Sequence, residues 1–216
     1  DASLVDLALL EALANGTQLT PGQSSLVRDM AGSGQRVQLA IAPAGTGKTT
    51  AMRVLGSAWA ESGGTVIGLA PSAAAAKALA DQLDVPCDTL AKLTWSLDHP
   101  EQPTPAWMAS IGPDSLVIID EAGMADTLSL DRAIAEVMIR GGSVRLIGDD
   151  RQLSAIGAGG VLRDIEAAHG ACRLHEVLRF DDPAEAAAST ALREGRTEAL
   201  GYYLDHDRVH VGDATT

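Results

Sequence analysis

The sequence predicts an α/β protein built on a mostly parallel sheet with helices on both faces. Short apolar segments that read as buried strands alternate with longer segments of helical periodicity, and this alternation is typical of a covered parallel sheet. The composition, 46% apolar and 21% charged over 216 residues, is that of a soluble globular protein with one sizeable core. The expected strands are residues 37–42, 65–70, 116–119 and 144–147.

The N-terminal part reads as two helices. Residues 4–13 carry apolar residues at helical spacing and are followed by Asn15-Gly16, a pair that favours a left-handed helix end. Thr20-Pro21 fits the cap and the first residue of a second helix.

Further helices are expected between the strands and after the last one. They cover residues 48–61, 72–83 and 127–140. Residues 87–113 are irregular and contain Pro100, Pro103 and Pro105, so we expect this segment to leave the sheet. After the last strand we expect a glycine-rich loop over residues 155–160, a helix over 161–168, a short strand at 173–174 and a helix over 183–195.

Bulk properties narrow the function classes. The net charge of −13 argues against a protein that binds nucleic acid through a broad basic surface, but it leaves open a narrow groove. No apolar run is long enough to insert in a membrane, and two cysteines without a CxxC favour a reducing cytoplasm. The chain starts at Asp1, so we expect a fragment of a longer protein. Within it we expect a single domain over residues 1–216, with a helical segment over 1–34 and the core over 35–216.

A phosphate-binding loop follows the first expected strand. Residues 42–50 read Ala-Pro-Ala-Gly-Thr-Gly-Lys-Thr-Thr, which fits Gly-x-x-x-x-Gly-Lys-Thr except that Ala42 replaces the first glycine. The remaining glycines let successive amides and a helix N-terminus face a phosphate. The predicted nucleotide-binding residues are Gly45, Thr46, Gly47, Lys48, Thr49 and Thr50.

Two of these residues have defined chemistry. Lys48 brings a charge to the β- and γ-phosphates, and the Thr49 hydroxyl is expected to ligate Mg²⁺. A glycine-containing turn with an incidental lysine is the alternative, but a strand before the loop and a helix after it disfavour that interpretation.

Two acids end the strand at residues 116–119. Asp120 is expected to hold Mg²⁺, and Glu121 is expected to activate the attacking water. The strand at 144–147 ends in Gly-Asp-Asp-Arg-Gln-Leu, where Gln152 is the candidate sensor of the γ-phosphate. We expect the 144–147 strand to lie between the phosphate-loop strand and the acid-bearing strand, as in phosphate-loop NTPases whose catalytic acid is on the metal strand.

Taken together, these motifs resemble superfamily 1 DNA helicases of the RecD-like branch, which includes the conjugative relaxase–helicases. The resemblance runs from residue 19 to residue 195 and implies the first of two RecA-like ATP-binding lobes, in a three-layer phosphate-loop NTPase fold. It implies that Gln23, in the Leu-Thr-Pro-Gly-Gln entry motif, contacts the adenine of ATP. It also implies that Arg179, in Val-Leu-Arg-Phe, reaches the γ-phosphate.

The resemblance further implies partners. Residues 68–76 and 89–93 resemble motifs that line the path of single-stranded DNA. The second lobe and its arginine are missing from the sequence, so we expect this chain by itself to bind ATP better than it hydrolyses it.

Other functions remain open at this point. A phosphate-loop switch that remodels a protein partner without DNA is the main alternative. A GTPase is weaker, because no lysine lies in an Asn/Thr-Lys-x-Asp pattern, and a small-molecule kinase is weaker still, because no arginine-rich lid is present. An inactive scaffold gains support only from Ala42, which has less backbone freedom than glycine.

Overall fold

A computed structural model describes residues 5–43, 45–149, 161–174, 182–193 and 195–209. The chain divides into two compact units, Asp1–His175 and Glu176–Thr216, and each is described by itself. The expectation that residues 1–216 form a single domain stays a prediction.

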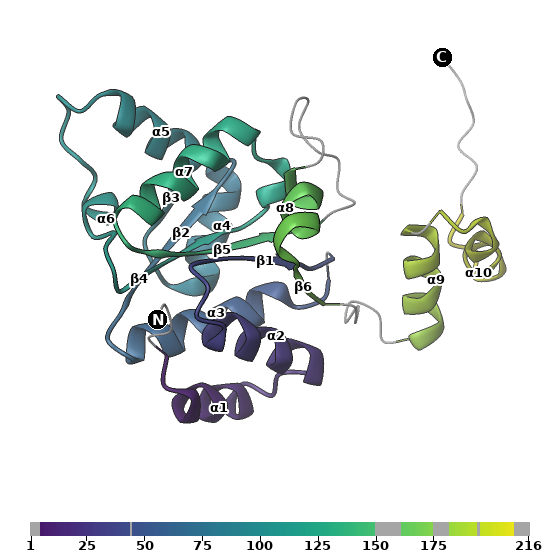
Figure 1. The fold of residues 1–216 in the computed structure, drawn as a ribbon. Coiled ribbons are helices and arrows are strands. Elements are labelled where there is room, and N and C mark those ends of the chain that lie inside the picture. Colours follow the sequence, from purple (N-terminus) through teal and green to yellow (C-terminus); the bar gives the residue numbers. More distant parts are fainter. Residues whose placement is uncertain (1–4, 44, 150–160, 175–181, 194, 210–216) are drawn as a thin grey trace, which may run out of the picture. The chain divides into compact units, whose positions relative to one another are not determined.

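The first unit is built on a six-stranded sheet in the order β3-β2-β4-β5-β1-β6. Every paired strand in it runs parallel to its neighbour. Strand β5 lies between β1 and β4, which confirms the predicted insertion (Figure 1). The strands are β1 (Val37–Ile41), β2 (Thr65–Ala70), β3 (Cys87–Thr89), β4 (Ser115–Ile119), β5 (Ser143–Gly148) and β6 (Cys172–Arg173).

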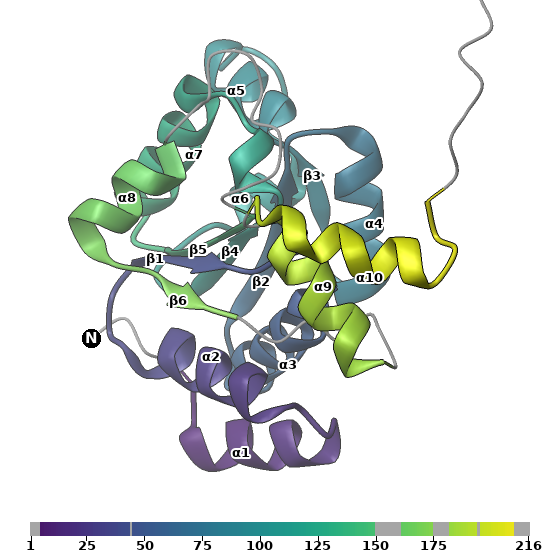
Figure 2. The ribbon, with the colours of Figure 1, turned by 90° about the vertical axis from the view of Figure 1, so that its right-hand side faces the viewer.

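Helices cover both faces of this sheet, as predicted (Figure 1 and Figure 2). One apolar core joins the sheet to the first four helices, and a second joins its other face to α5, α7 and α8. Alternate strand residues serve the two cores: Ala40 belongs to the first, and Leu39 and Ile41 to the second. The helices are α1 (Leu7–Gly16), α2 (Pro21–Gly32), α3 (Lys48–Glu61), α4 (Ala73–Leu83), α5 (Leu90–Asp98), α6 (Ala106–Ala109), η1 (Ala122–Met124), α7 (Thr127–Ile139) and α8 (Val161–His169).

Side-chain caps fix where several helices begin. Thr20 and Gln23 form a reciprocal capping box at the start of α2, where Pro21 occupies the first turn. Ser72 caps α4 and Thr89 caps α5 by accepting a backbone N–H three residues later. These caps place the helix starts directly after the carboxyl ends of β2 and β3.

The segment over residues 87–113 corrects one expectation. It was expected to leave the sheet, but β3 pairs with β2 in parallel and forms an edge of the sheet, and α5 and α6 follow. A three-residue strand is too short to show a period of two, and all of its residues are half-buried. The prolines that motivated the expectation lie after α5, outside the strand.

The second unit contains only short helical elements among its described residues: α9 (Pro183–Arg193), η2 (Thr197–Ala199) and α10 (Leu200–Asp205). Within this unit the Tyr202 hydroxyl donates to Asp182, a contact that raises the pKa of Tyr202 to about 12. Among the described residues of both units, no helix is long and apolar enough to cross a membrane.

Candidate nucleotide site

The loop between β1 and α3 has the backbone of a phosphate cradle. Gly45 and Gly47 both adopt left-handed conformations, with φ of 84° and 72°, which side chains other than glycine rarely tolerate. Gly47 is also the N-cap of α3 and has no side chain to cap it. The first amides of α3 and the positive end of its dipole are therefore open to an anion.

Ala42 occupies a position that does not require glycine. It is fully buried at the end of β1, and its amide donates to the Gly148 carbonyl oxygen at 2.9 Å. It is not among the described residues that have positive φ. The alanine continues the core packing of β1, and the bend of the loop starts beyond it.

Lys48 and Asp120 meet although 72 positions separate them in the sequence. The Lys48 ammonium donates to Asp120 Oδ1 at 2.9 Å, and the two side chains are only 19% and 15% exposed. The same carboxylate oxygen accepts the Glu121 amide at 2.8 Å. The predicted phosphate lysine is thus paired with the predicted metal acid, and a phosphate must compete with Asp120 for it.

Glu121 stands at a strained turn of the backbone. Its φ of 52° and ψ of 34° are left-handed, an arrangement that costs a non-glycine residue about 1 kcal/mol or more and that clusters at functional sites. Just before it, the Asp120 amide donates to the Leu69 carbonyl oxygen of β2 at 3.0 Å. The acid pair is therefore held at the exit of β4 by backbone bonds on both residues.

Gln23 contacts the phosphate loop. Its side chain is buried, and its amide nitrogen donates to the carbonyl oxygens of Thr46 at 3.0 Å and Gly47 at 3.4 Å. Its amide oxygen accepts the Thr20 N–H at 3.0 Å. The structure thus shows Gln23 linking the start of α2 to the loop, and the adenine contact implied by the resemblance stays a proposal. The Thr-x-x-Gln spacing signals the cap, but nothing in the sequence signals the link to the loop.

The other predicted site residues divide into three groups. The Thr46 hydroxyl is used inside the loop, where it donates to the Pro43 carbonyl oxygen at 2.8 Å. Thr49 and Thr50 are half-buried in the first turn of α3. Gln152 and Arg179 lie outside the described residues, so their roles stay predictions.

Arg145 is a buried residue that the sequence analysis missed. It lies in β5 and is 1% exposed, and its guanidinium donates to the Met30 carbonyl oxygen at 3.0 and 2.6 Å and to the Gln35 carbonyl oxygen at 3.2 Å. Burial lowers the pKa of this guanidinium to about 10. The contacts fasten the end of α2, the helix that carries Gln23, to β5. A lone cation within the apolar segment Val-Arg-Leu-Ile was the available signal.

The sequence was compared with protein families and with known proteins. A family model described as AAA domain matches residues 18–214. The chain is 28% identical over 184 residues to the probable conjugal transfer protein TraA of Sinorhizobium fredii, covering 85% of this chain and 16% of the relative. It is 29% identical over 196 residues to the conjugal transfer protein TraA of Rhizobium radiobacter, covering 89% of this chain and 17% of the relative.

A solved structure shares the fold. The crystal structure of Pif1 helicase from Candida albicans matches with a TM-score of 0.61 at 15% identity, covering 91% of this chain and 49% of that protein. The predicted α/β phosphate-loop fold and the resemblance to helicases and conjugative transfer proteins are confirmed. The chain belongs to the AAA domain family, and it spans 16–17% of the length of the TraA relatives it matches.

Proposed function

We propose that this member of the AAA domain family is the ATP-binding lobe of an ATP-dependent DNA helicase or translocase, within a conjugative DNA-transfer protein of the relaxase–helicase type. The observation that carries the proposal is the Lys48–Asp120 contact, which brings the phosphate loop and the metal strand together across β5. The names of the TraA relatives and the fold shared with Pif1 helicase support the choice of motor.

In this proposal, the predicted site residues that the structure describes each have a role in ATP hydrolysis. Loop amides from Gly45 to Thr50 cradle the β-phosphate, and the Lys48 ammonium leaves Asp120 to contact the β- and γ-phosphates. Thr49 and Asp120 are the residues that would hold Mg²⁺, and the bound ion would neutralise phosphate charge. Glu121 takes the proton of the attacking water as general base.

Further contacts complete the site. Gln23 lies beside the loop and is the proposed adenine contact, and Gln152 and Arg179 are the proposed γ-phosphate contacts. A second RecA-like lobe outside this chain supplies the remaining charge stabilisation, and single-stranded DNA runs across both lobes. Cys87 and Cys172 are free thiols, which suits the reducing cytoplasm that we propose as the site of action.

The test is whether DNA stimulates ATP hydrolysis. A chain extended through the downstream lobe is assayed for phosphate release with and without an oligothymidylate, next to its Glu121→Gln variant. We expect strong stimulation by DNA in the parent chain, and in the variant a turnover lower by roughly 10²–10⁴ with ATP affinity retained, because glutamine keeps the shape but cannot accept the proton. Hydrolysis that ignores DNA and responds to a protein partner would instead identify a protein-remodelling switch.

A further inference from the structure

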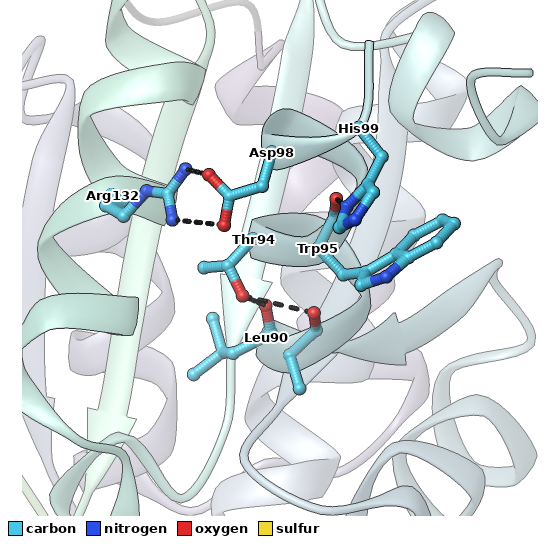
Figure 3. Close-up of polar contacts among 7 residues, drawn as sticks. Leu90, Thr94, Trp95, Asp98, His99 and Arg132 are labelled. Carbon is cyan, nitrogen blue, oxygen red and sulfur yellow. Dashed lines mark hydrogen bonds and ion pairs between the residues drawn. The ribbon is translucent and has the colours of Figure 1, made fainter. Parts of the chain in front are cut away.

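An aromatic and cationic stack projects from α5, outside the nucleotide site. The Trp95 side chain is 43% exposed, and the His99 ring lies against it with centroids 4.4 Å apart and planes 19° from parallel. The Lys92 ammonium lies 4.3 Å from the centroid of the Trp95 ring. Figure 3 shows the Trp95 and His99 rings together at the end of α5. These three residues, Lys92, Trp95 and His99, are called the Trp95 stack below.

Local contacts hold the stack in place. His99 Nδ1 donates to the Trp95 carbonyl oxygen at 2.8 Å, which fixes the histidine ring at the helix end. The neighbouring Asp98 receives a two-pronged contact from Arg132 of α7, at 3.0 and 2.6 Å (Figure 3). This contact ties the end of α5 to α7, and it pairs the carboxylate that directly precedes His99 with a cation. The Arg132 hydrogen bonds also lower the pKa of Asp98.

Helix α5, which carries the stack, starts at the same edge of the sheet as the nucleotide site. Helix α5 begins at Leu90, directly after Thr89, which caps the helix and ends β3. Lys92 lies in the first turn of α5, and Trp95 and His99 follow towards its other end. Strand β3 is joined through β2 to β4, the strand that carries the acid pair. Because adjacent strands lie about 4.8 Å apart, β3 is roughly 10 Å from β4. The Asp120–Leu69 backbone bond connects the metal acid to β2, which leads into α4 beside this edge.

We propose that the Trp95 stack is a stacking platform for a base of single-stranded nucleic acid. Any base can stack on an indole face, and the adjoining phosphate supplies the negative charge that a cation needs. In the free protein the Lys92 ammonium covers one face of the Trp95 ring. A base that takes this face releases the ammonium to the neighbouring phosphate, so one exchange satisfies both partners. This inference rests on the proposed function, in which single-stranded DNA runs across this lobe.

Charge favours a nucleic acid over an apolar protein surface as the occupant. An apolar partner pressed on Trp95 would bury the Lys92 ammonium without a counter-charge, which is costly. A polyanion instead pairs with it. The Lys92 ammonium gives the stack a local positive charge on a chain whose net charge is −13, which favours an anionic occupant at this place.

Crosslinking to the unaltered chain is the first arm of the test. An oligothymidylate carrying one 5-iodouracil is irradiated with the protein at low salt, and the adduct is located by mass spectrometry. We expect the adduct on Trp95 or His99. An adduct found elsewhere and never on these residues overturns the inference.

Binding by variants is the second arm. Anisotropy with a labelled oligothymidylate is expected to show roughly tenfold weaker binding for Trp95→Ala and a change within about twofold for Trp95→Phe, which keeps an aromatic face. Lys92→Ala is expected to lower the salt slope by about one, while Arg53→Ala, an exposed cation on α3, leaves the crosslink position unchanged. ATP affinity and melting temperature serve as folding controls for all four variants.

The outcomes separate the two proposals. If the unaltered chain binds oligothymidylate and Trp95→Ala binds it equally well, the stacking inference is wrong and the motor proposal stands. If the unaltered chain gives neither binding nor an adduct at low salt, the stacking inference is wrong. The proposed DNA function fails only if DNA also leaves ATP hydrolysis by the extended chain unchanged. Capture of a protein by Trp95 without any response to oligothymidylate would assign the stack to a protein partner.

Discussion

The centre and the outer side of the sheet's carboxyl edge are built differently. At the centre, β4 and β5 are buried along their whole length, and the predicted catalytic groups bind one another through Lys48 and Asp120. At the outer side, β3 is half-buried, and α5, which starts there, carries the Trp95 stack on side chains alone. Trp95 is exposed, and the other two residues of the stack are half-buried. The proposed nucleotide site is thus preformed by backbone geometry and a half-buried ion pair, whereas the proposed stacking site is a surface feature.

This difference determines what a ligand must displace at each place. A phosphate that enters the centre must displace Asp120 from Lys48, and the displaced carboxylate is then available for a metal ion. A base that stacks on Trp95 displaces only the ammonium of the half-buried Lys92. Substitutions at the centre should therefore change nucleotide binding strongly. Substitutions in the frame, by which we mean the buried contacts that hold α2 against β5, should change stability instead.

The largest effect is expected from Lys48→Ala. The substitution removes the main positive partner of the phosphates, and two charge-assisted hydrogen bonds of about 1.5 kcal/mol each correspond to roughly 100-fold weaker ATP binding. Titration of the chain with a fluorescent ATP analogue and Mg²⁺ measures this change. The matched control is Lys77→Ala, because Lys77 is exposed and pairs only locally with Asp81 at 2.8 Å. Equal effects of the two substitutions would contradict a phosphate role for Lys48.

Arg145→Met tests the frame and is expected to have the next largest effect. Methionine fills much of the same volume but leaves the buried carbonyl oxygen of Met30 without the donor that Arg145 supplies, at a cost of roughly 2 kcal/mol in the free energy of unfolding. Urea denaturation followed by circular dichroism measures it, with Arg53→Met on the exposed face of α3 as the control. An unchanged unfolding midpoint would show that Arg145 does not anchor α2.

The smallest effects compare two positions of the phosphate loop. Gly47→Ala forces a side chain into a left-handed conformation at a cost of about 1 kcal/mol and is expected to weaken ATP binding several-fold. Ala42→Gly is expected to leave ATP affinity within about twofold and to lower stability slightly, because Ala42 packs in the core. The same titration and denaturation measure both variants. A gain in affinity with glycine at position 42 would show that the alanine does restrain the loop.

Local patterns predicted which elements meet at the centre of the sheet's carboxyl edge. The phosphate loop, the acid pair and the strand between them are marked by short motifs, because phosphate and metal chemistry demand fixed residue types at fixed spacings. The order β1-β5-β4 follows from those motifs and is confirmed.

Long-range contacts were not predictable in the same way. Gln23 contacts Thr46 across 23 positions, and Arg145 contacts Met30 across 115, so neither link leaves a local pattern. Strand β3 was missed because three half-buried residues carry no periodicity. The Trp95 stack follows helical spacings of three and four, yet its exposure depends on how α5 packs against α7.

The most direct test of the account uses the 216-residue chain by itself, without DNA. ATP binding is measured by equilibrium titration with and without Mg²⁺, and phosphate release is followed on the same sample. The account predicts weak, saturable, Mg²⁺-dependent binding with negligible hydrolysis, because the cradle is preformed but the charge supplied by a second lobe is absent. Rapid hydrolysis by the isolated chain, or no ATP binding at all, would contradict it.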